Sequence, residues 1–101
     1  MIDQRFGKLE VLSQAPKGSA RATPLLFVHG AYTAAWCWAE NFLPWFAEQG
    51  WQAHAISLSG HGGSAGREHL DSLSIADYVR NVAEVVSRLA ARPVLIGHSM
   101  G

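Results

Sequence analysis

The 101-residue chain has few charged residues and a single cysteine. Charged side chains make up 16% of the sequence and balance to a formal net charge of zero. Such a chain creates no strong field that would attract nucleic acid or an anionic membrane. Cys37 has no second cysteine for an internal disulfide, which is typical of a reducing compartment. We therefore expect a cytoplasmic protein that binds neither nucleic acid nor membranes.

Long apolar runs are also missing. Residues 1–7 do not form the apolar core of a signal peptide, and no segment approaches the length of a membrane span. Hydrophobic residues still make up 49% of the chain, which indicates a folded globular protein. Its histidines show neither the H-E-x-x-H spacing nor clustered cysteine or carboxylate partners, so we expect no metal site. These histidines are His29, His54, His61, His69 and His98.

The order of apolar and polar residues predicts an α/β fold. Strands are expected at residues 8–13, 25–28, 51–58 and 93–97, where short apolar or alternating runs occur. An amphipathic helix is expected from about Ser74 to Ala91, because Ser74 and Asp77 have capping-box spacing ahead of an apolar stripe. A second helical segment begins near Trp36, is interrupted at Pro44 and ends at Gly50. Right-handed crossovers would place the helices on both faces of a mostly parallel sheet.

The segment at the carboxyl end of the last predicted strand carries the strongest functional signal. It is a G-x-S-x-G sequence, in which a serine in a sharp strand-to-helix turn exposes its hydroxyl to a base and a substrate. Side chains at the two outer positions would crowd that turn, so both are expected to be glycine. We interpret Ser99 as a nucleophile on this basis. The segment reads Gly97-His98-Ser99-Met100-Gly101.

A second segment, at residues 25–31, offers a backbone N–H donor, which acyl transfer to a serine also requires. Negative charge develops on the substrate carbonyl oxygen, and preorganised N–H donors must stabilise it. The Met100 N–H follows the nucleophile directly, and Gly30 allows the Ala31 N–H to approach from a neighbouring strand end. We predict that these two amides form the oxyanion hole. His29 is assigned a structural role beside this loop.

His98 is a poor candidate for the catalytic base. Adjacent side chains on a sharp turn point apart, so its ring is expected to point away from Ser99. We interpret His98 as part of the structural motif.

Three motifs in this order resemble the α/β-hydrolase fold family: VHGA at 28–31, SGHGGS at 59–64 and GHSMG at 97–101. The resemblance runs from about Pro24 to Gly101 and departs from the common pattern at Ser57, where many members have an aspartate. It implies that residues 1–101 are the N-terminal portion of one hydrolase domain. The catalytic acid, the histidine and the lid would then follow the serine in the chain.

The resemblance further implies that the strand ending at Val28 lies between the strands ending near Leu58 and Gly97. Ser99 and Ala31 would then meet at a crevice. The expected chemistry is hydrolysis of a small carboxylic ester through an acyl-enzyme, without metal or organic cofactor. The oligomeric state stays open.

Three other interpretations are weighed against this one. Residues 29–38 are similar to esterases that include the plant methyl-esterase and hydroxynitrile-lyase branch, so carbon–carbon cleavage is one alternative. A non-catalytic truncated fragment is another, and an uncovered last strand would then expose apolar surface. Residues 60–65 also match a dinucleotide-binding glycine pattern, but no helix is expected to begin directly after them, which argues against it.

Overall fold

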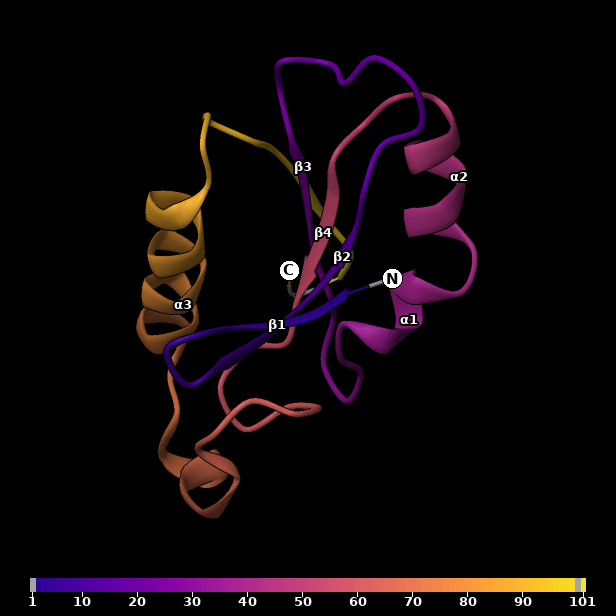
Figure 1. Ribbon diagram of the computed structural model, residues 1–101. Helices are drawn as coiled ribbons and strands as arrows, with labels where there is room; N and C mark the ends of the chain where they lie inside the picture. The colour runs from indigo at the N-terminus through magenta and orange to yellow at the C-terminus, as the bar shows by residue number, and fades with distance from the viewer. Residues whose placement is uncertain (1, 100) are drawn as a thin grey trace.

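The computed structural model describes residues 2–99 and residue 101, and it contains a five-stranded sheet between helices (Figure 1). The strands are β1 (Ile2–Phe6), β2 (Leu9–Gln14), β3 (Leu25–Val28), β4 (Ala53–Ile56) and β5 (Val94–Gly97). The helices are α1 (Trp36–Ala39), α2 (Phe42–Glu48), the 3-10 helix η1 (Arg67–Ser72) and α3 (Ile75–Arg88). In the described part of the chain, no helix is long and apolar enough to cross a membrane.

The sheet has the strand order β1-β2-β4-β3-β5, so the predicted α/β class is confirmed. The strand β3 pairs in parallel with β4 on one side and with β5 on the other. The remaining pairs, β1 with β2 and β2 with β4, are antiparallel, which makes the sheet mixed. The parallel part brings the carboxyl ends of β3, β4 and β5 to the same end of the sheet.

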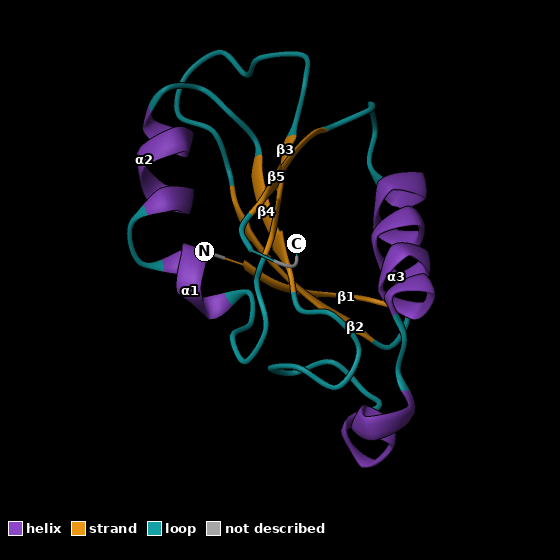
Figure 2. Ribbon diagram, turned by 180° about the vertical axis from the view of Figure 1, so that it is seen from behind, coloured by secondary structure: helices purple, strands orange, loops and turns teal. Residues whose placement is uncertain are grey.

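The two faces of the sheet have separate cores, because the side chains of β3 alternate between them. Leu26 and Val28 pack with Val85 of α3 on one face. Leu25 and Phe27 pack with Trp38 of α1 on the other. Figures 1 and 2 show α3 on one side of the sheet and α1 with α2 on the opposite side. Both helical layers thus hold β3, which explains why all four of its residues are buried.

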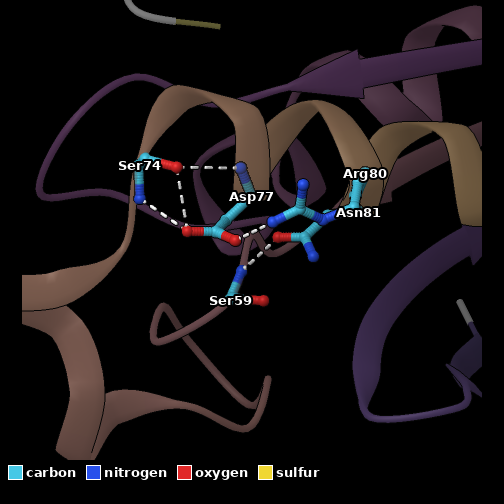
Figure 3. Close-up of polar contacts among 5 residues, drawn as sticks. All are labelled: Ser59, Ser74, Asp77, Arg80 and Asn81. Carbon is cyan, nitrogen blue, oxygen red and sulfur yellow. Dashed lines mark hydrogen bonds and ion pairs between the residues drawn. The ribbon is translucent and has the colours of Figure 1, made fainter.

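The helix α3 begins at the predicted capping box. The Ser74 hydroxyl accepts from the Asp77 N–H at 3.3 Å, and the Asp77 carboxylate accepts from the Ser74 N–H at 2.7 Å (Figure 3). The Ser74 N–H, the Ser74 hydroxyl and Arg80 hold the pKa of Asp77 below its usual range. Farther along the helix, Asn81 Oδ1 accepts from the Ser59 N–H at 2.8 Å. Through this bond α3 anchors the loop that follows β4.

The helix α3 is shorter and less covered than its sequence predicts. It ends at Arg88, because Leu89 adopts an extended conformation. Ile75 and Val79, two members of the predicted apolar stripe, are each 60% exposed. They line an apolar groove of about 600 Å³ between α3 and β5, together with Leu95. The edge strand β5 therefore exposes apolar surface.

The aromatic residues after β3 divide between core and surface. Trp38 and Phe46 pack against Phe27 with tilted rings, whose centroids are 4.9 and 5.5 Å away. Trp36 and Trp45 are mostly exposed, so only part of this aromatic group packs in the core. Pro44 lies in the first turn of α2, where its missing N–H costs no helical bond.

Candidate active site

Ser99 lies just beyond the end of β5, with its side chain exposed. Its φ of 59° is in the left-handed region, which residues other than glycine rarely adopt. Backbone strain of this kind concentrates at functional sites, where the surrounding fold must maintain it. Met100, the predicted source of one oxyanion N–H, lies outside the described residues.

The turn around Ser99 is packed too tightly for side chains at its two glycines. A Cβ atom on Gly97 would collide with the Gly101 backbone, and one on Gly101 would collide with the carbonyl oxygens of Val28 and His29. The His98 N–H also donates to the Val28 carbonyl oxygen at 3.2 Å. The turn therefore rests directly on the carboxyl end of β3.

Gly30 brings the loop after β3 into contact with Ser99. A Cβ atom built on Gly30 would lie 2.9 Å from Ser99 Cβ and 3.0 Å from the His98 carbonyl oxygen. Only a residue without a side chain permits this approach. Two segments far apart in the sequence thus meet at one point, as the motif analysis predicts.

The peptide between Gly30 and Ala31 is held in a fixed orientation. Its carbonyl oxygen accepts from His29 Nδ1 at 2.7 Å and from Thr33 Oγ1 at 2.8 Å. In a trans peptide the N–H points opposite to the carbonyl, so these bonds also orient the Ala31 N–H. The next residue, Tyr32, has a φ of 64° and is 98% exposed. The site therefore contains both non-glycine residues with positive φ found in the described part of the chain.

His29 is buried and uses both ring nitrogens within the fold. Because Nδ1 donates to the Gly30 carbonyl, Nε2 is the acceptor, and it receives the Leu58 N–H at 3.0 Å. Burial is the main cause that lowers the pKa of His29. The ring is thus neutral, with one defined tautomer, and it links the ends of β3 and β4.

The structure also contains a serine–histidine pair that the sequence analysis missed. Ser13 Oγ lies 2.7 Å from His54 Nδ1, across the antiparallel pair of β2 and β4. Ser13 is buried, so its hydroxyl is closed to a substrate in the observed fold. Burial also lowers the pKa of His54. The strand alternation alone could have placed these residues on the sheet, but not opposite each other.

Among the described side chains, neither His61 nor His98 is hydrogen-bonded to Ser99. His61 Nδ1 lies 3.0 Å from the Ser59 carbonyl oxygen, and its ring is 4.9 Å from that of His29. The His98 ring meets Trp38 edge-on, at 6.5 Å between centroids. The side chain of His69 lies outside what is described. Within the described residues, no three or more histidine, cysteine, aspartate or glutamate residues gather as metal ligands do.

A partly buried polar network, also missed from the sequence, supports the loop that carries Gly30. Glu10 Oε1 accepts from the Ser57 hydroxyl at 2.7 Å and from the Gly63 N–H at 2.9 Å. The Ser57 oxygen in turn accepts from the Ala35 N–H at 3.0 Å. The Ser64 hydroxyl donates to the Ser57 carbonyl oxygen at 2.5 Å. The position where the sequence departs from the family pattern is therefore fully hydrogen-bonded.

The alpha/beta hydrolase family model matches residues 25–101. The chain belongs to this family. The predicted resemblance and the predicted fold are thereby both confirmed. The match spans all three motifs used in the sequence analysis, from the strand before Gly30 to the glycine after Ser99.

Relatives of this alpha/beta hydrolase chain include proteins named as hydrolases. A pyrethroid hydrolase of Sphingobium wenxiniae is 32% identical over 79 residues, which are 78% of this chain and 28% of the relative. The structure of a probable hydrolytic enzyme from Pseudomonas aeruginosa PAO1 has a TM-score of 0.79 and 31% identity, covering 92% of this chain and 29% of that one. A thioesterase domain from the curacin biosynthetic pathway has a TM-score of 0.77 and 30% identity, covering 92% and 32%. The chain spans less than a third of each relative's length.

Proposed function

We propose that this chain is the N-terminal part of a serine hydrolase that cleaves small carboxylic esters through an acyl-enzyme. Ser99 is the nucleophile, and the N–H groups of Ala31 and Met100 are the oxyanion donors. The observation that carries the proposal is the contact between two loops. An exposed serine in a left-handed conformation faces a glycine whose peptide is held by two hydrogen bonds.

In the proposed reaction, Ser99 Oγ attacks the ester carbonyl carbon while a base takes the hydroxyl proton. The carbonyl π electrons move to the oxygen, and the oxyanion accepts hydrogen bonds from the two amides. Collapse of the intermediate breaks the bond to the alkoxide, which leaves with the proton as an alcohol. Water then attacks the acyl-enzyme by the same route and releases the acid. No metal or organic cofactor takes part.

The base and its acidic partner are proposed to lie downstream of Ser99, in the order serine, acid, histidine. Among the described residues, no histidine ring is hydrogen-bonded to Ser99, and His29 is occupied at both nitrogens. A chain limited to residues 1–101 is therefore proposed to lack ester-hydrolase turnover. The short share of each relative that the chain covers agrees with this proposal.

A serine-directed phosphonate probe tests the proposal on the full-length protein. We expect labelling of Ser99, identified by mass spectrometry of the modified peptide, and complete loss of labelling in Ser99→Ala. Ser19→Ala, a change at an exposed loop residue, is the matched control and should label normally. Labelling that survives Ser99→Ala would remove Ser99 from the role of nucleophile.

A further inference from the structure

The loop from His29 to Ala35, which carries the proposed oxyanion donor, is held at both ends by consecutive residues of the neighbouring chain segment. At its start, His29 Nε2 accepts from the Leu58 N–H. At its end, the Ala35 N–H donates to the Ser57 hydroxyl oxygen. All four residues are buried. Residues 57 and 58 therefore act as a clamp on the loop.

Glu10 determines which way the Ser57 hydroxyl points. A serine hydroxyl has one proton to donate, and here the carboxylate of Glu10 receives it at 2.7 Å. The lone pairs of Ser57 Oγ are then directed to the Ala35 N–H. A hydrogen bond to a carboxylate is stronger than one between neutral groups, so this orientation is firmly held.

The glycines of the SGHGGS motif make room for the same carboxylate. A Cβ atom on Gly62 would lie 2.7 Å from both Glu10 Oε1 and Ser57 Oγ, and one on Gly63 would lie 2.5 Å from Glu10 Oε2. The Gly63 N–H also donates to Glu10 Oε1. The backbone at 62–63 is thus built around Glu10, which gives these glycines a steric reason unrelated to nucleotide binding.

We propose that Glu10 and Ser57 are a positioning pair for the proposed ester hydrolysis. Glu10 orients the Ser57 hydroxyl, Ser57 holds the Ala35 N–H, and the loop so fixed places the Ala31 N–H beside Ser99. Neither side chain touches the substrate. The catalytic consequence rests on the proposed function, whereas the fixing of the loop does not depend on it.

The test uses variants of the full-length protein. Single changes first alter the carboxylate at residue 10, and a double variant then moves it to residue 57. Glu10→Ala removes the acceptor, and kcat for p-nitrophenyl acetate should fall about 10- to 100-fold with KM within about twofold, because a small displacement of a donor has this effect. Glu10→Gln retains an amide oxygen for both donors and should keep kcat within about threefold to fivefold of wild type. Glu40→Ala, at an exposed position near the end of α1, is the control and should leave kcat unchanged.

The double variant is the most discriminating arm. Ser57→Asp alone places a second carboxylate against Glu10, and like charges at this distance repel, so kcat should fall. Combining Ser57→Asp with Glu10→Ala leaves one carboxylate that accepts directly from the Ala35 N–H. We expect the double variant to recover at least about tenfold over Ser57→Asp, a coupling that independent sites would not give. A double variant no better than either single change overturns the proposal.

Amide hydrogen exchange separates this proposal from the proposed function. In Glu10→Ala, exchange of the Ala35 amide, which donates to Ser57, should accelerate at least about tenfold while the amides of α3 stay protected. If the phosphonate probe fails to label Ser99, the proposed function fails, yet the exchange result still decides the clamp. Unchanged exchange and unchanged kcat in Glu10→Ala would refute the pair. Should that variant lose its fold, the comparison of Ser57→Asp with the double variant decides.

Discussion

Replacing Gly30 by alanine tests the contact between the two loops most directly. The new Cβ atom would lie 2.9 Å from Ser99 Cβ, 3.0 Å from the His98 carbonyl oxygen and 3.3 Å from His98 Nδ1. Carbon atoms in contact prefer about 3.5–4.0 Å, so the loops must separate by about 0.6–1.1 Å. The φ of Gly30 lies outside the left-handed region, so backbone strain does not contribute.

A displacement of this size acts on catalysis more than on folding. A misplacement of about 1 Å at a reacting centre lowers rates about 100-fold. Overpacking at a buried contact costs about 1–3 kcal/mol of stability. For Gly30→Ala in the full-length protein we therefore expect kcat for p-nitrophenyl acetate to fall about 100-fold. The rate of Ser99 labelling by the phosphonate probe should fall in parallel, while the protein stays folded at 25 °C.

Gly18→Ala is the matched control for the assay. Gly18 has a φ of +68°, and a Cβ atom there would have no neighbour within 4 Å. This variant should lose about 1–2 kcal/mol through backbone strain alone and keep its kcat. If Gly30→Ala instead labels Ser99 at the wild-type rate with kcat within about twofold, the proposed approach of the two loops is wrong.

Three further outcomes are expected. Burial lowers the pKa of His29 and of His54 below 6.5, so the unfolded chain binds protons that the folded chain does not. The contribution of these two histidines to the free energy of unfolding is complete above pH 6.5. It falls as the pH drops below 6.5, by up to about 1.4 kcal/mol per pH unit for each proton. Equal urea midpoints at pH 7.5 and 5.5 would contradict this. Ser74→Ala removes the cap of α3 and should cost about 1 kcal/mol, or a drop in Tm of about 2–4 °C, measured by a thermal melt of the full-length protein and not of the isolated 101-residue chain. That isolated chain should aggregate or melt at low temperature because Leu95 on edge strand β5 is 53% exposed, whereas a sharp cooperative melt as a monomer would argue against it.

Local signals account for the parts of the fold that the sequence predicts well. The capping box joins Ser74 to Asp77, three residues away, and the observed helix begins at Ile75, one residue after Ser74. The four apolar residues of β3 form one buried run, and Gly50, with a φ of +91°, follows the end of α2 as expected. Each of these features depends on neighbours in the chain, so spacing alone reveals it.

Features that depend on distant partners were missed or misjudged. The strand β1 reads IDQRF, with apolar residues only at its ends, and it forms by pairing with β2. The predicted strand at residues 51–58 is observed only at Ala53–Ile56. Before it, the Trp51 N–H bonds the Phe46 carbonyl oxygen, and after it the Leu58 N–H bonds the His29 ring. The Glu10–Ser57 bond joins residues 47 positions apart, and no short pattern encodes it.

At the candidate site, sequence reasoning predicted that the loop at residues 30–31 approaches Ser99, but not the hydrogen-bond network that holds this loop. The glycine and the serine each stand in a short motif after a strand, so the family pattern brings them together. The network through Glu10 and Ser57 depends on side chains from β2 and from the end of β4. The pattern of one strand says nothing about the residue across the sheet.

The place of β3 at the centre of the parallel strands has a consequence for the order of folding. Gly30 follows β3 and Ser99 follows β5, which joins the sheet only through β3 and begins at Val94. Contacts between segments so far apart form late, because closing the intervening chain costs entropy before any pairing compensates. A nascent chain can therefore complete its hairpin and its first two helices while the two loops are still apart. The Ser99 hydroxyl therefore reaches the loop that carries Gly30 only when β5 docks on β3.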